Sequence, residues 1–255
     1  MIFLAAGTQD AREIALLLLE KGYEVTASVV SEYGKILLQE QKNLTVIEKM
    51  LDEKLLRECL QNSKVNIFID ASHPYAVNIS KTAMQVCEEL GIVYIRYERP
   101  ITALPQYDKL YKVESFEAAA VKAFELGDNV FLTTGSRHLR EFTDCRKENQ
   151  QLTVRVLPAL ESVQACINEK ISLKDIIAMQ GPFSHALNKA MYAQTKAQVV
   201  VMKNSGKLGG TDTKITAAIE AGLALIVIDR PQIKYKNIFT DKEALLKKIG
   251  QSIVD

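Results

Sequence analysis

The sequence lacks an excess of charge of either sign. Its 255 residues include 32 lysines and arginines against 31 aspartates and glutamates, which gives a formal net charge of +1. A protein that binds nucleic acid over a wide surface needs a basic face or stripe to contact the phosphates. We therefore expect no nucleic-acid partner.

Long apolar runs and a leader-like start are also lacking. No apolar stretch approaches the roughly 18 residues of a membrane-spanning helix. The N-terminus has no basic segment followed by an extended apolar core, which a secretory signal peptide would have. We therefore expect a cytoplasmic protein with no membrane partner.

Cysteine is scarce, and its spacing does not indicate a metal site. The four cysteines are Cys59, Cys87, Cys145 and Cys166. They form no C-x-x-C pair and have no histidines nearby, so we expect no metal bound by the protein. All four lie in stretches predicted to be helical, where a cysteine usually packs as a small buried apolar side chain.

Strand-like apolar runs and helical stretches alternate along the chain. Apolar residues make up 47% of it, enough for one large core or two modest ones. The alternation is typical of α/β proteins with parallel sheets and right-handed crossovers. An irregular segment with Pro100 and Pro105 interrupts the pattern. We therefore predict two α/β domains, residues 1–100 and 101–255.

The predicted strands are short and regularly spaced. In the first domain they span residues 2–6, 23–30, 44–48, 65–70 and 92–96. In the second they span residues 129–133, 152–157, 175–179, 198–202 and 224–229. Helices are predicted between them, including residues 116–126, and a last helix is predicted at residues 241–252.

A turn at Gly7 and Thr8 joins the first strand to the first helix. Ala5, Gly7 and Asp10 occupy the three glycine places of the dinucleotide fingerprint G-x-G-x-x-G, so only the middle glycine is present. Such a turn presents backbone N–H groups and the positive end of a helix to a ligand. We predict that Gly7, Thr8 and Gln9 bind a nicotinamide cofactor. The alternative is that Thr8 caps the helix and Asp10, whose carboxylate would repel a phosphate, offsets its dipole.

The loop after the fourth predicted strand is expected beside this turn. In the usual doubly wound order the first and fourth strands are neighbours, so residues 70–74 would share one crevice with Gly7. Ser72 is assigned to the cofactor on this ground. His73, one of three histidines, is the candidate catalytic proton donor. The alternative is a local hydrogen bond at the start of the next helix.

The end of the second predicted strand indicates which nicotinamide is used. An acidic residue there usually binds the ribose 2′-hydroxyl of NAD. Ser28, Ser31 and Lys35 suit the 2′-phosphate of NADPH instead, whereas Glu32 does not. We predict NADPH, with Ser31 as a cofactor ligand, and keep NADH as the alternative.

Polar or cationic loops follow four of the five strands predicted in the second domain. Ligands usually bind at the carboxyl ends of parallel strands. The loops there carry Arg137, Lys203, Asn204 and Arg230, which together favour an anionic ligand. Lys214 lies in the first turn of a predicted helix, where a cation is unfavourable for the helix dipole. That local conflict indicates a ligand-binding role for Lys214.

Two arginines, Arg96 and Arg99, follow the fifth predicted strand. They are either solvated partners of acidic residues or a clamp for substrate carboxylates, whose geometry the guanidinium group matches. The sequence leaves both interpretations open.

Tyr192 and Lys196 have the Y-x-x-x-K spacing of short-chain dehydrogenases. That family also needs a glycine-rich turn of the T-G-x-x-x-G-x-G type, which this sequence does not contain. We therefore interpret Tyr192 as an ordinary helix residue.

These motifs, taken in order, resemble those of the precorrin-6A reductases of cobalamin biosynthesis and their cobalt-precorrin counterparts. The motifs are AGTQDAR (6–12), DASHPYA (70–76), RYERP (96–100), FLTTG (131–135), QGPF (180–183), KNSG (203–206) and TKITAA (213–218). They cover the chain from end to end in the order of the family. The departures are Ala6 in place of a usual glycine, Ser72 in place of a common threonine, and a divergent turn at 31–34.

The resemblance implies two Rossmann-like domains with parallel sheets and an active site in the cleft between them. The Gly7 turn favours the first domain as the one that binds the dinucleotide, and we expect the second to contribute to substrate and cofactor binding. A reduced nicotinamide would transfer a hydride to a double bond of a tetrapyrrole, and a proton would join the adjacent carbon. The residues assigned to the substrate are Arg99, Arg137, Lys203, Asn204, Ser205 and Lys214.

Several alternatives stay open at this point. The substrate contains cobalt or is metal-free, and the oligomeric state is not predicted. One competing function is another NAD(P)-dependent oxidoreductase with a small substrate. The other is a two-lobed binding protein that holds an anionic ligand without catalysis.

Overall fold

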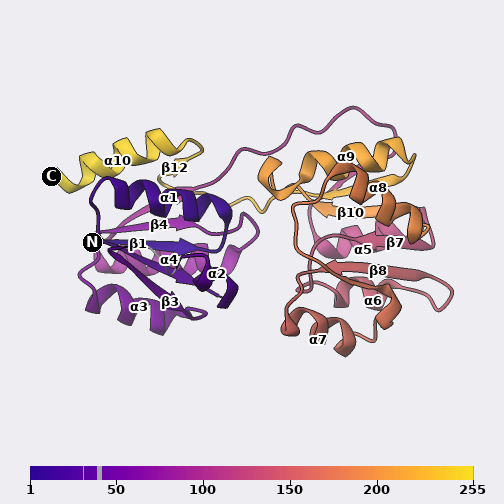
Figure 1. Cartoon of the computed structure of the whole chain (residues 1–255), viewed down its shortest axis with the longest axis horizontal. Coiled ribbons are helices and arrows are strands. Elements are labelled where there is room, and N and C mark those ends of the chain that lie inside the picture. Colours follow the sequence, from indigo (N-terminus) through magenta and orange to yellow (C-terminus); the bar gives the residue numbers. More distant parts are fainter. Residues whose placement is uncertain (31, 39–41, 255) are drawn as a thin grey trace. The chain divides into compact units, whose positions relative to one another are not determined.

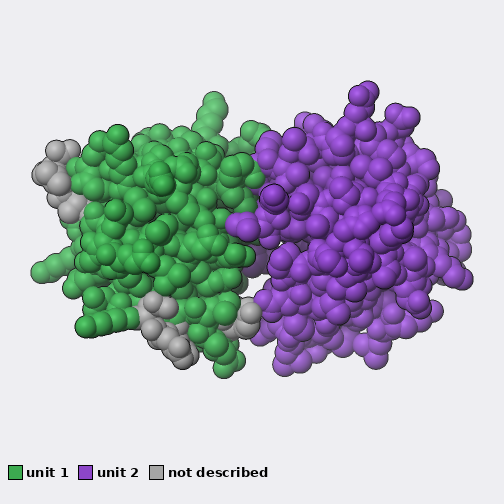
Figure 2. Space-filling model, turned by 45° about the horizontal axis from the view of Figure 1, so that its top comes forward, with its two compact units in different colours: residues 1–100, 231–255 green, residues 101–230 purple. Residues whose placement is uncertain are grey.

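A computed structural model describes residues 1–30, 32–38 and 42–254. The chain forms two compact units, coloured separately in Figure 2. The first unit comprises Met1–Pro100 and Pro231–Asp255, and the second comprises Ile101–Arg230. Each contains a six-stranded sheet in which every pair of neighbouring strands is parallel. The predicted α/β class with two parallel sheets is confirmed.

The sheet of the first unit has the order β12-β5-β4-β1-β2-β3 (Figure 1). Its strands are β1 (Ile2–Ala6), β2 (Val25–Val29), β3 (Leu44–Glu48), β4 (Ile67–Ala71), β5 (Val93–Tyr97) and β12 (Ile238–Phe239). Its helices are α1 (Gln9–Glu20), α2 (Glu32–Ile36), α3 (Glu53–Asn62), α4 (Val77–Leu90) and α10 (Lys242–Val254). Strands β1 and β4 are neighbours, as predicted. The carboxyl ends of β1 and β4 therefore form the switch point at which such folds bind ligands.

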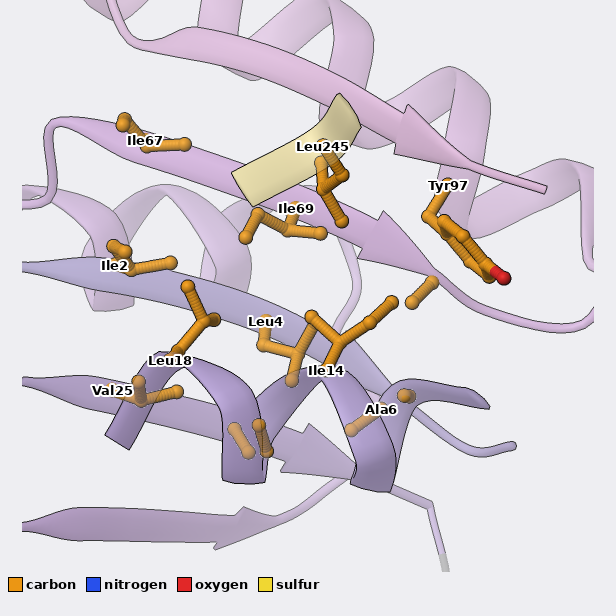
Figure 3. Close-up of a cluster of buried hydrophobic side chains, with 14 of the residues drawn as sticks. Ile2, Leu4, Ala6, Ile14, Leu18, Val25, Ile67, Ile69, Tyr97 and Leu245 are labelled. Carbon is orange, nitrogen blue, oxygen red and sulfur yellow. The ribbon is translucent and has the colours of Figure 1, made fainter. Parts of the chain in front are cut away.

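The core of the first unit lies on both faces of its sheet. Every residue of β1 is buried, as expected for a parallel strand covered on two sides. Ile2 and Leu4 pack with Leu18 of α1 on one face (Figure 3). Phe3, which points the other way, packs with Leu56 of α3 and with residues of α4. Helices α1 and α10 thus cover one face, and α3 and α4 cover the other.

The C-terminal segment belongs to the first unit, whereas we placed all of residues 101–255 in the second domain. Strand β12 pairs with β5, with Ile238 opposite Arg96. Leu245 and Ile249 of α10 are fully buried in the core beside α1. A division of the chain into two continuous stretches cannot describe a segment that returns to the first sheet.

The second unit has the same arrangement, with the sheet order β6-β11-β10-β7-β8-β9. Its strands are β6 (Leu110–Val113), β7 (Asn129–Leu132), β8 (Gln151–Val156), β9 (Ile176–Ala178), β10 (Val199–Lys203) and β11 (Ala224–Ile228). Its helices are α5 (Phe116–Leu126), α6 (Arg140–Cys145), α7 (Leu160–Asn168), α8 (His185–Gln194) and α9 (Thr211–Glu220). Strands β7 and β10 take the central places that β1 and β4 take in the first unit. The edge strands β6 and β12 were not predicted.

The four cysteines lie on helices, as predicted, and all are free thiols. Cys87 and Cys166 are buried, which confirms the interpretation for these two, whereas Cys59 and Cys145 are partly exposed. Within the described ranges, no helix is both long and apolar enough to cross a membrane.

Candidate functional site

The turn after β1 leads into a capped helix N-terminus beside the end of β4. The Thr8 hydroxyl accepts a hydrogen bond from Ala11 N (3.1 Å) and donates one to Ala71 O (3.0 Å). The second bond ties the start of α1 to β4. Among the described residues, none other than Gly7 and its two chain neighbours has an atom within 4 Å of the point where a Gly7 side chain would begin. The predicted cap is therefore present, and the backbone beside it is open to a ligand.

Asp10, which replaces the third fingerprint glycine, is buried and ion-paired. Its Oδ2 lies 3.2 Å from Arg99 Nη1, and its Oδ1 lies 3.8 Å from Lys242 Nζ. Lys242 also pairs with Glu13 of α1. Two acidic and two basic side chains thus balance one another, so the repulsion of a phosphate by Asp10 is offset. This contact also places Arg99, which we assigned to the substrate, beside the predicted cofactor turn.

A small pocket opens at this edge of the first sheet. Thr8, Asp10, Ser72, Tyr97 and Arg99 line it, among others. The structure therefore brings together two of the residues predicted to bind the cofactor, Thr8 and Ser72.

The other residues assigned to the cofactor are placed differently. Gln9 is exposed, and its amide donates a hydrogen bond to Glu13 Oε1 (3.1 Å). Ser31 lies outside the described residues.

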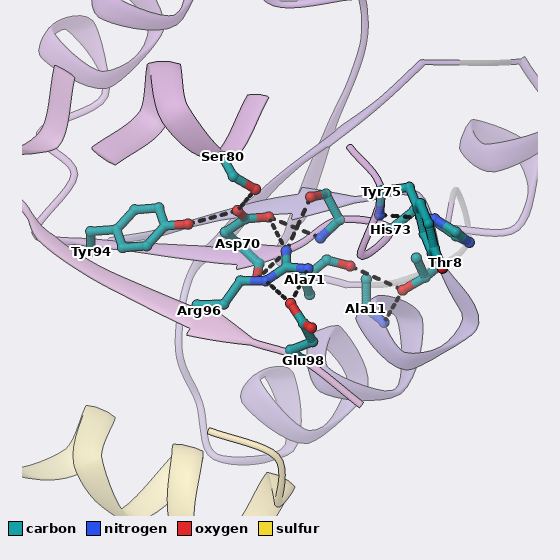
Figure 4. A network of polar contacts seen from close by, with 11 residues as sticks. Thr8, Ala11, Asp70, Ala71, His73, Tyr75, Ser80, Tyr94, Arg96 and Glu98 are labelled. Carbon is teal, nitrogen blue, oxygen red and sulfur yellow. Dashed lines mark hydrogen bonds and ion pairs between the residues drawn. The ribbon is translucent and has the colours of Figure 1, made fainter. Parts of the chain in front are cut away.

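Next to the pocket, a buried ion pair fixes the loop after β4 (Figure 4). Arg96 Nη1 lies 2.8 Å from Asp70 Oδ1, and neither side chain is accessible to solvent. Asp70 also accepts hydrogen bonds from Ser80 Oγ (2.6 Å), Tyr94 OH (2.7 Å) and Ser72 N (3.0 Å). Burial acts to raise the pKa of Asp70, but Arg96 and these hydrogen bonds together hold that pKa below its usual value.

Arg96 has neither of the two roles that the sequence left open. Its Nε and Nη2 donate to Glu98 Oε2 (3.1 and 3.0 Å), and Nη1 donates to Ser72 Oγ (3.2 Å) as well as to Asp70. The guanidinium also lies over the Tyr235 ring (5.4 Å). Arg96 is therefore an interior residue, neither solvated nor open to a substrate carboxylate.

His73 makes the local hydrogen bond that was the alternative to a catalytic role. Its Nδ1 accepts a hydrogen bond from Tyr75 N (3.3 Å). A ring nitrogen that accepts a hydrogen bond carries no proton, so Nδ1 is the acceptor in this contact. His73 can act as an acid only after Nδ1 gains a proton and this contact opens.

In the second unit, basic side chains gather at the carboxyl ends of the strands. Lys203 is the last residue of β10, Arg137 lies in the loop after β7, and Lys214 lies in the first turn of α9. Burial and the charge of Arg137 lower the pKa of Lys203 to about 8. Burial, Arg155 and Lys203 lower the pKa of Lys214 to about 7. These shifts fit a cluster that has more positive than negative charge.

Arg155 belongs to this cluster and was missed by sequence reasoning. It lies within β8 rather than in a loop, and 5% of its surface is exposed. Its Nη1 donates to Asn188 Oδ1 (2.8 Å), and its guanidinium lies over the Phe183 ring (4.0 Å). Burial lowers its pKa to about 10. A signal was available in the sequence, since Arg155 is a charged residue inside the apolar run 152–157. Charged side chains are almost never buried unless paired, so such a residue indicates a partner or a ligand.

Asn204 and Ser205, both assigned to the substrate, are buried and make structural contacts. The Asn204 amide accepts from Thr102 N (3.1 Å) and donates to Thr102 O (2.8 Å). Ser205 N donates to Thr211 Oγ1 (3.1 Å) at the start of α9. These contacts hold the segment around Thr102 and the loop before α9.

Tyr192 is buried in α8, as its interpretation as an ordinary helix residue requires. Its ring packs edge-on against Phe131, with the centroids 5.2 Å apart. Burial raises the pKa of its hydroxyl, the opposite of what a catalytic tyrosine in a Y-x-x-x-K pair needs.

The chain is similar to known proteins over almost its whole length. Residues 1–250 match the family described as precorrin-6x reductase CbiJ/CobK. A cobalt-precorrin-6A reductase of Priestia megaterium is 38% identical and covers 96% of both chains. One of Methanocaldococcus jannaschii is 35% identical and covers 98% of both chains.

A solved structure has the same fold. A chain titled CobK precorrin-6A reductase matches with a TM-score of 0.82 and 23% identity, over 98% of this chain and 96% of that one. The fold likeness and the full-length match to the family agree with the predicted reductase. The chain therefore belongs to the precorrin-6x reductase (CbiJ/CobK) family of cobalamin biosynthesis.

Proposed function

We propose that this enzyme reduces cobalt-precorrin-6A with a reduced nicotinamide cofactor. The observation that carries the proposal is the full-length similarity to proteins named cobalt-precorrin-6A reductase, which are 32% to 38% identical. Proteins named precorrin-6A reductase, without cobalt, match at 27% and 31%. This difference supports the cobalt-containing substrate over the metal-free one.

The first unit is the proposed site of the cofactor diphosphate, at the N-terminus of α1. The open backbone at Gly7 admits a close approach, and the helix dipole favours an anion there. Arg99 and Lys242 balance the charge of Asp10, so the residues present fit a diphosphate. When bound, the reduced nicotinamide supplies a hydride, and the protein's task is to bind and orient it.

NADPH is the proposed cofactor. Lys35 follows β2 in the chain and pairs with Glu48 at 3.5 Å. Both side chains are partly exposed, and an exposed pair of this kind is weak, so the Lys35 ammonium is easily released to a 2′-phosphate. Glu32, in the first turn of α2, is the residue that would favour NADH instead.

The second unit is the proposed site of the substrate carboxylates. Arg137, Lys203 and Lys214 supply positive charge there, as a tetrapyrrole with several carboxylates requires. His73 of the first unit is the proposed proton donor, which acts once its contact with Tyr75 opens. We also propose that the enzyme works in the cytoplasm, where it has access to reduced nicotinamide cofactors.

The test is anaerobic absorbance at the reduced-nicotinamide band. NADPH and NADH are each combined with cobalt-precorrin-6A and with precorrin-6A. We expect the band to decay fastest with NADPH and cobalt-precorrin-6A. Faster decay with NADH or with the metal-free substrate would reverse that part of the proposal. Binding of both substrates without any oxidation of cofactor would overturn the proposed reaction.

A further inference from the structure

We infer that Arg155 and Lys214 form an oxyanion-binding site inside the second unit, and that this site takes up a proton when a carboxylate or phosphate enters it. The inference rests on the proposed function only for the source of the oxyanion. That source is either a carboxylate of the substrate or a phosphate of the cofactor.

The two cations are buried without an acidic partner. Lys214 is 9% exposed, and Arg155 is 5% exposed. Lys214 Nζ donates to Gly209 O (2.9 Å), and Arg155 Nη1 contacts Asn188 Oδ1 and Met191 Sδ. Among the residues that the structure describes, no Asp or Glu forms an ion pair with either cation, although the charge of Asp212 acts on Lys214 from a longer distance. A buried charge is costly unless it is paired, so an anion from outside the chain fits this arrangement.

A single buried amide holds the two parts of the site together. Asn188 has no exposed surface. Its Oδ1 accepts from Arg155, and its Nδ2 donates to Ser184 O (3.0 Å) and lies 3.4 Å from Thr213 Oγ1. Thr213 directly precedes Lys214. The network therefore joins β8, the start of α8 and the first turn of α9 before any ligand arrives.

The first turn of α9 adds positive character to the site. The helix begins after Gly210, whose φ is +66°, and no side chain caps its N-terminal N–H groups. A lysine here adds to the positive end of the helix dipole instead of offsetting it. Thr211 N donates to Gly206 O (3.4 Å), so the N–H groups that follow it in the first turn are the ones available to an oxyanion.

The charges that face Lys214 explain the proton uptake. Arg155 of β8 and Lys203 of β10 oppose its positive charge, and Asp212 of its own helix supports it less strongly. With burial, these charges hold the pKa of Lys214 to about 7, well below the ordinary value of a lysine, so part of the population is unprotonated near neutral pH.

Other elements also pack against α9: α8, β11 and the short helix Lys207–Gly209, which carries the further cation Lys207. On α8, His185 and Lys189 pair with Glu220, the last residue of α9, rather than with its first turn. An entering oxyanion therefore cancels the repulsion at Lys214 and raises its pKa. A proton from solvent then joins Nζ.

Calorimetric titration measures both binding and proton uptake. NADPH, NADH and cobalt-precorrin-6A are titrated separately into the intact enzyme at pH 7, in two buffers with different heats of ionisation. Inorganic pyrophosphate is the fourth probe. With at least one of these, we expect uptake of a measurable fraction of a proton per site, from the linkage between binding and protonation. The probe that produces the uptake identifies the source of the oxyanion.

Three variants distinguish the contribution of positive charge to binding from the proton uptake by Lys214. Lys214→Arg keeps the positive charge but does not titrate near neutral pH, so binding should stay within about threefold and the uptake should vanish. Lys214→Met and Arg155→Met should each weaken binding of the same probe about tenfold or more. Lys122→Met is the matched control, because Lys122 pairs with Glu125 on the surface of the same unit. Lys122→Met should change neither the affinity for the probe nor the proton uptake.

Three outcomes would overturn the inference: no probe gives proton uptake, the uptake persists in Lys214→Arg, or the two methionine variants bind every probe as tightly as the natural chain. The test does not depend on turnover. If uptake requires Lys214 but no cofactor is oxidised, the oxyanion site stands and the proposed reaction fails.

Discussion

Asp70 and Arg96 lie opposite each other on β4 and β5 and form an ion pair of 2.8 Å that excludes solvent completely. Removing two charges from water is costly and is compensated only when the remaining polar atoms are satisfied. Both carboxylate oxygens of Asp70 meet this condition through their bonds to Arg96, Ser72, Ser80 and Tyr94. The pair thus fixes the backbone at Ser72, at the edge of the candidate cofactor pocket.

Breaking this pair should destabilise the first unit strongly. In Asp70→Asn the charge of Arg96 stays buried with only Glu98 to offset it, so we expect a loss of about 3–5 kcal/mol in the free energy of unfolding. Urea unfolding measures the loss. Glu125→Gln, which removes an exposed partner of Lys122, should leave the urea midpoint unchanged. Equal effects of the two substitutions would contradict the prediction.

The same pair predicts the direction of the pH dependence. The pKa of Asp70 is lowered in the folded chain from its ordinary value of 3.8, so the stabilisation is fully present above about pH 4 and is lost as the pH falls further. The difference in unfolding free energy between the natural chain and Asp70→Asn should therefore shrink below pH 4. A difference that stays constant from pH 7 to pH 3 would rule out this linkage.

Thr8 both caps α1 and bonds to β4, so its removal should cost more than the loss of a simple cap. We expect Thr8→Ala to lower the free energy of unfolding by about 1–2 kcal/mol. Thr8→Ser should restore most of the loss. Ser115→Ala is the matched control, because Ser115 caps α5 through Ala118 N (3.1 Å). A larger loss for Ser115→Ala than for Thr8→Ala would show that the bond to Ala71 adds nothing.

The cysteines should react with a thiol reagent in two classes. Burial raises the pKa of Cys87 to about 12 and also raises that of Cys166, so both thiols stay protonated and shielded at neutral pH. Cys59 and Cys145 are partly exposed and should react first. Mass spectrometry of peptides after brief labelling checks the order. Early labelling of Cys87 in the folded enzyme would contradict it.

His73 can be tested with two substitutions that mimic its two nitrogens. His73→Asn keeps a hydrogen-bond acceptor near the position of Nδ1, and His73→Gln keeps a polar group near the position of Nε2. If His73 donates the proton, both variants should lose about 10²–10⁴ in kcat with little change in cofactor binding. An Asn variant with nearly full kcat would show that the contact with Tyr75 N is the whole role of this side chain.

Local signals were enough to predict much of the fold. The bounds of β3 and α5 agree with the predicted 44–48 and 116–126, because Ser115 caps α5 and the polar residues Asn43 and Lys49 flank β3. The neighbouring positions of β1 and β4 followed from the alternation of strands and helices.

Tertiary contacts decide the features that were missed. Strands β6 and β12 are short edge strands that form by pairing with β11 and β5, and their own residues carry little signal. The burial of Arg96 depends on Asp70, 26 residues earlier in the chain. Arg155 was not predicted because it lies within a strand, where the sequence alone does not show that its side chain is buried. The ligand-binding role of Lys214, which its position at a helix start indicates, stays a prediction. The sequence could not show that the charge of Arg155 on β8 acts on Lys214.

The return of β12 and α10 to the first sheet affects the order in which the chain folds during synthesis. Domains usually fold as units from the N-terminus while the ribosome extends the chain. Here the first unit lacks an edge strand and Leu245 and Ile249 of its core until its last segment has been made. The second unit is continuous and can be completed earlier. The first unit, whose synthesis begins first, is therefore the unit whose folding is completed last.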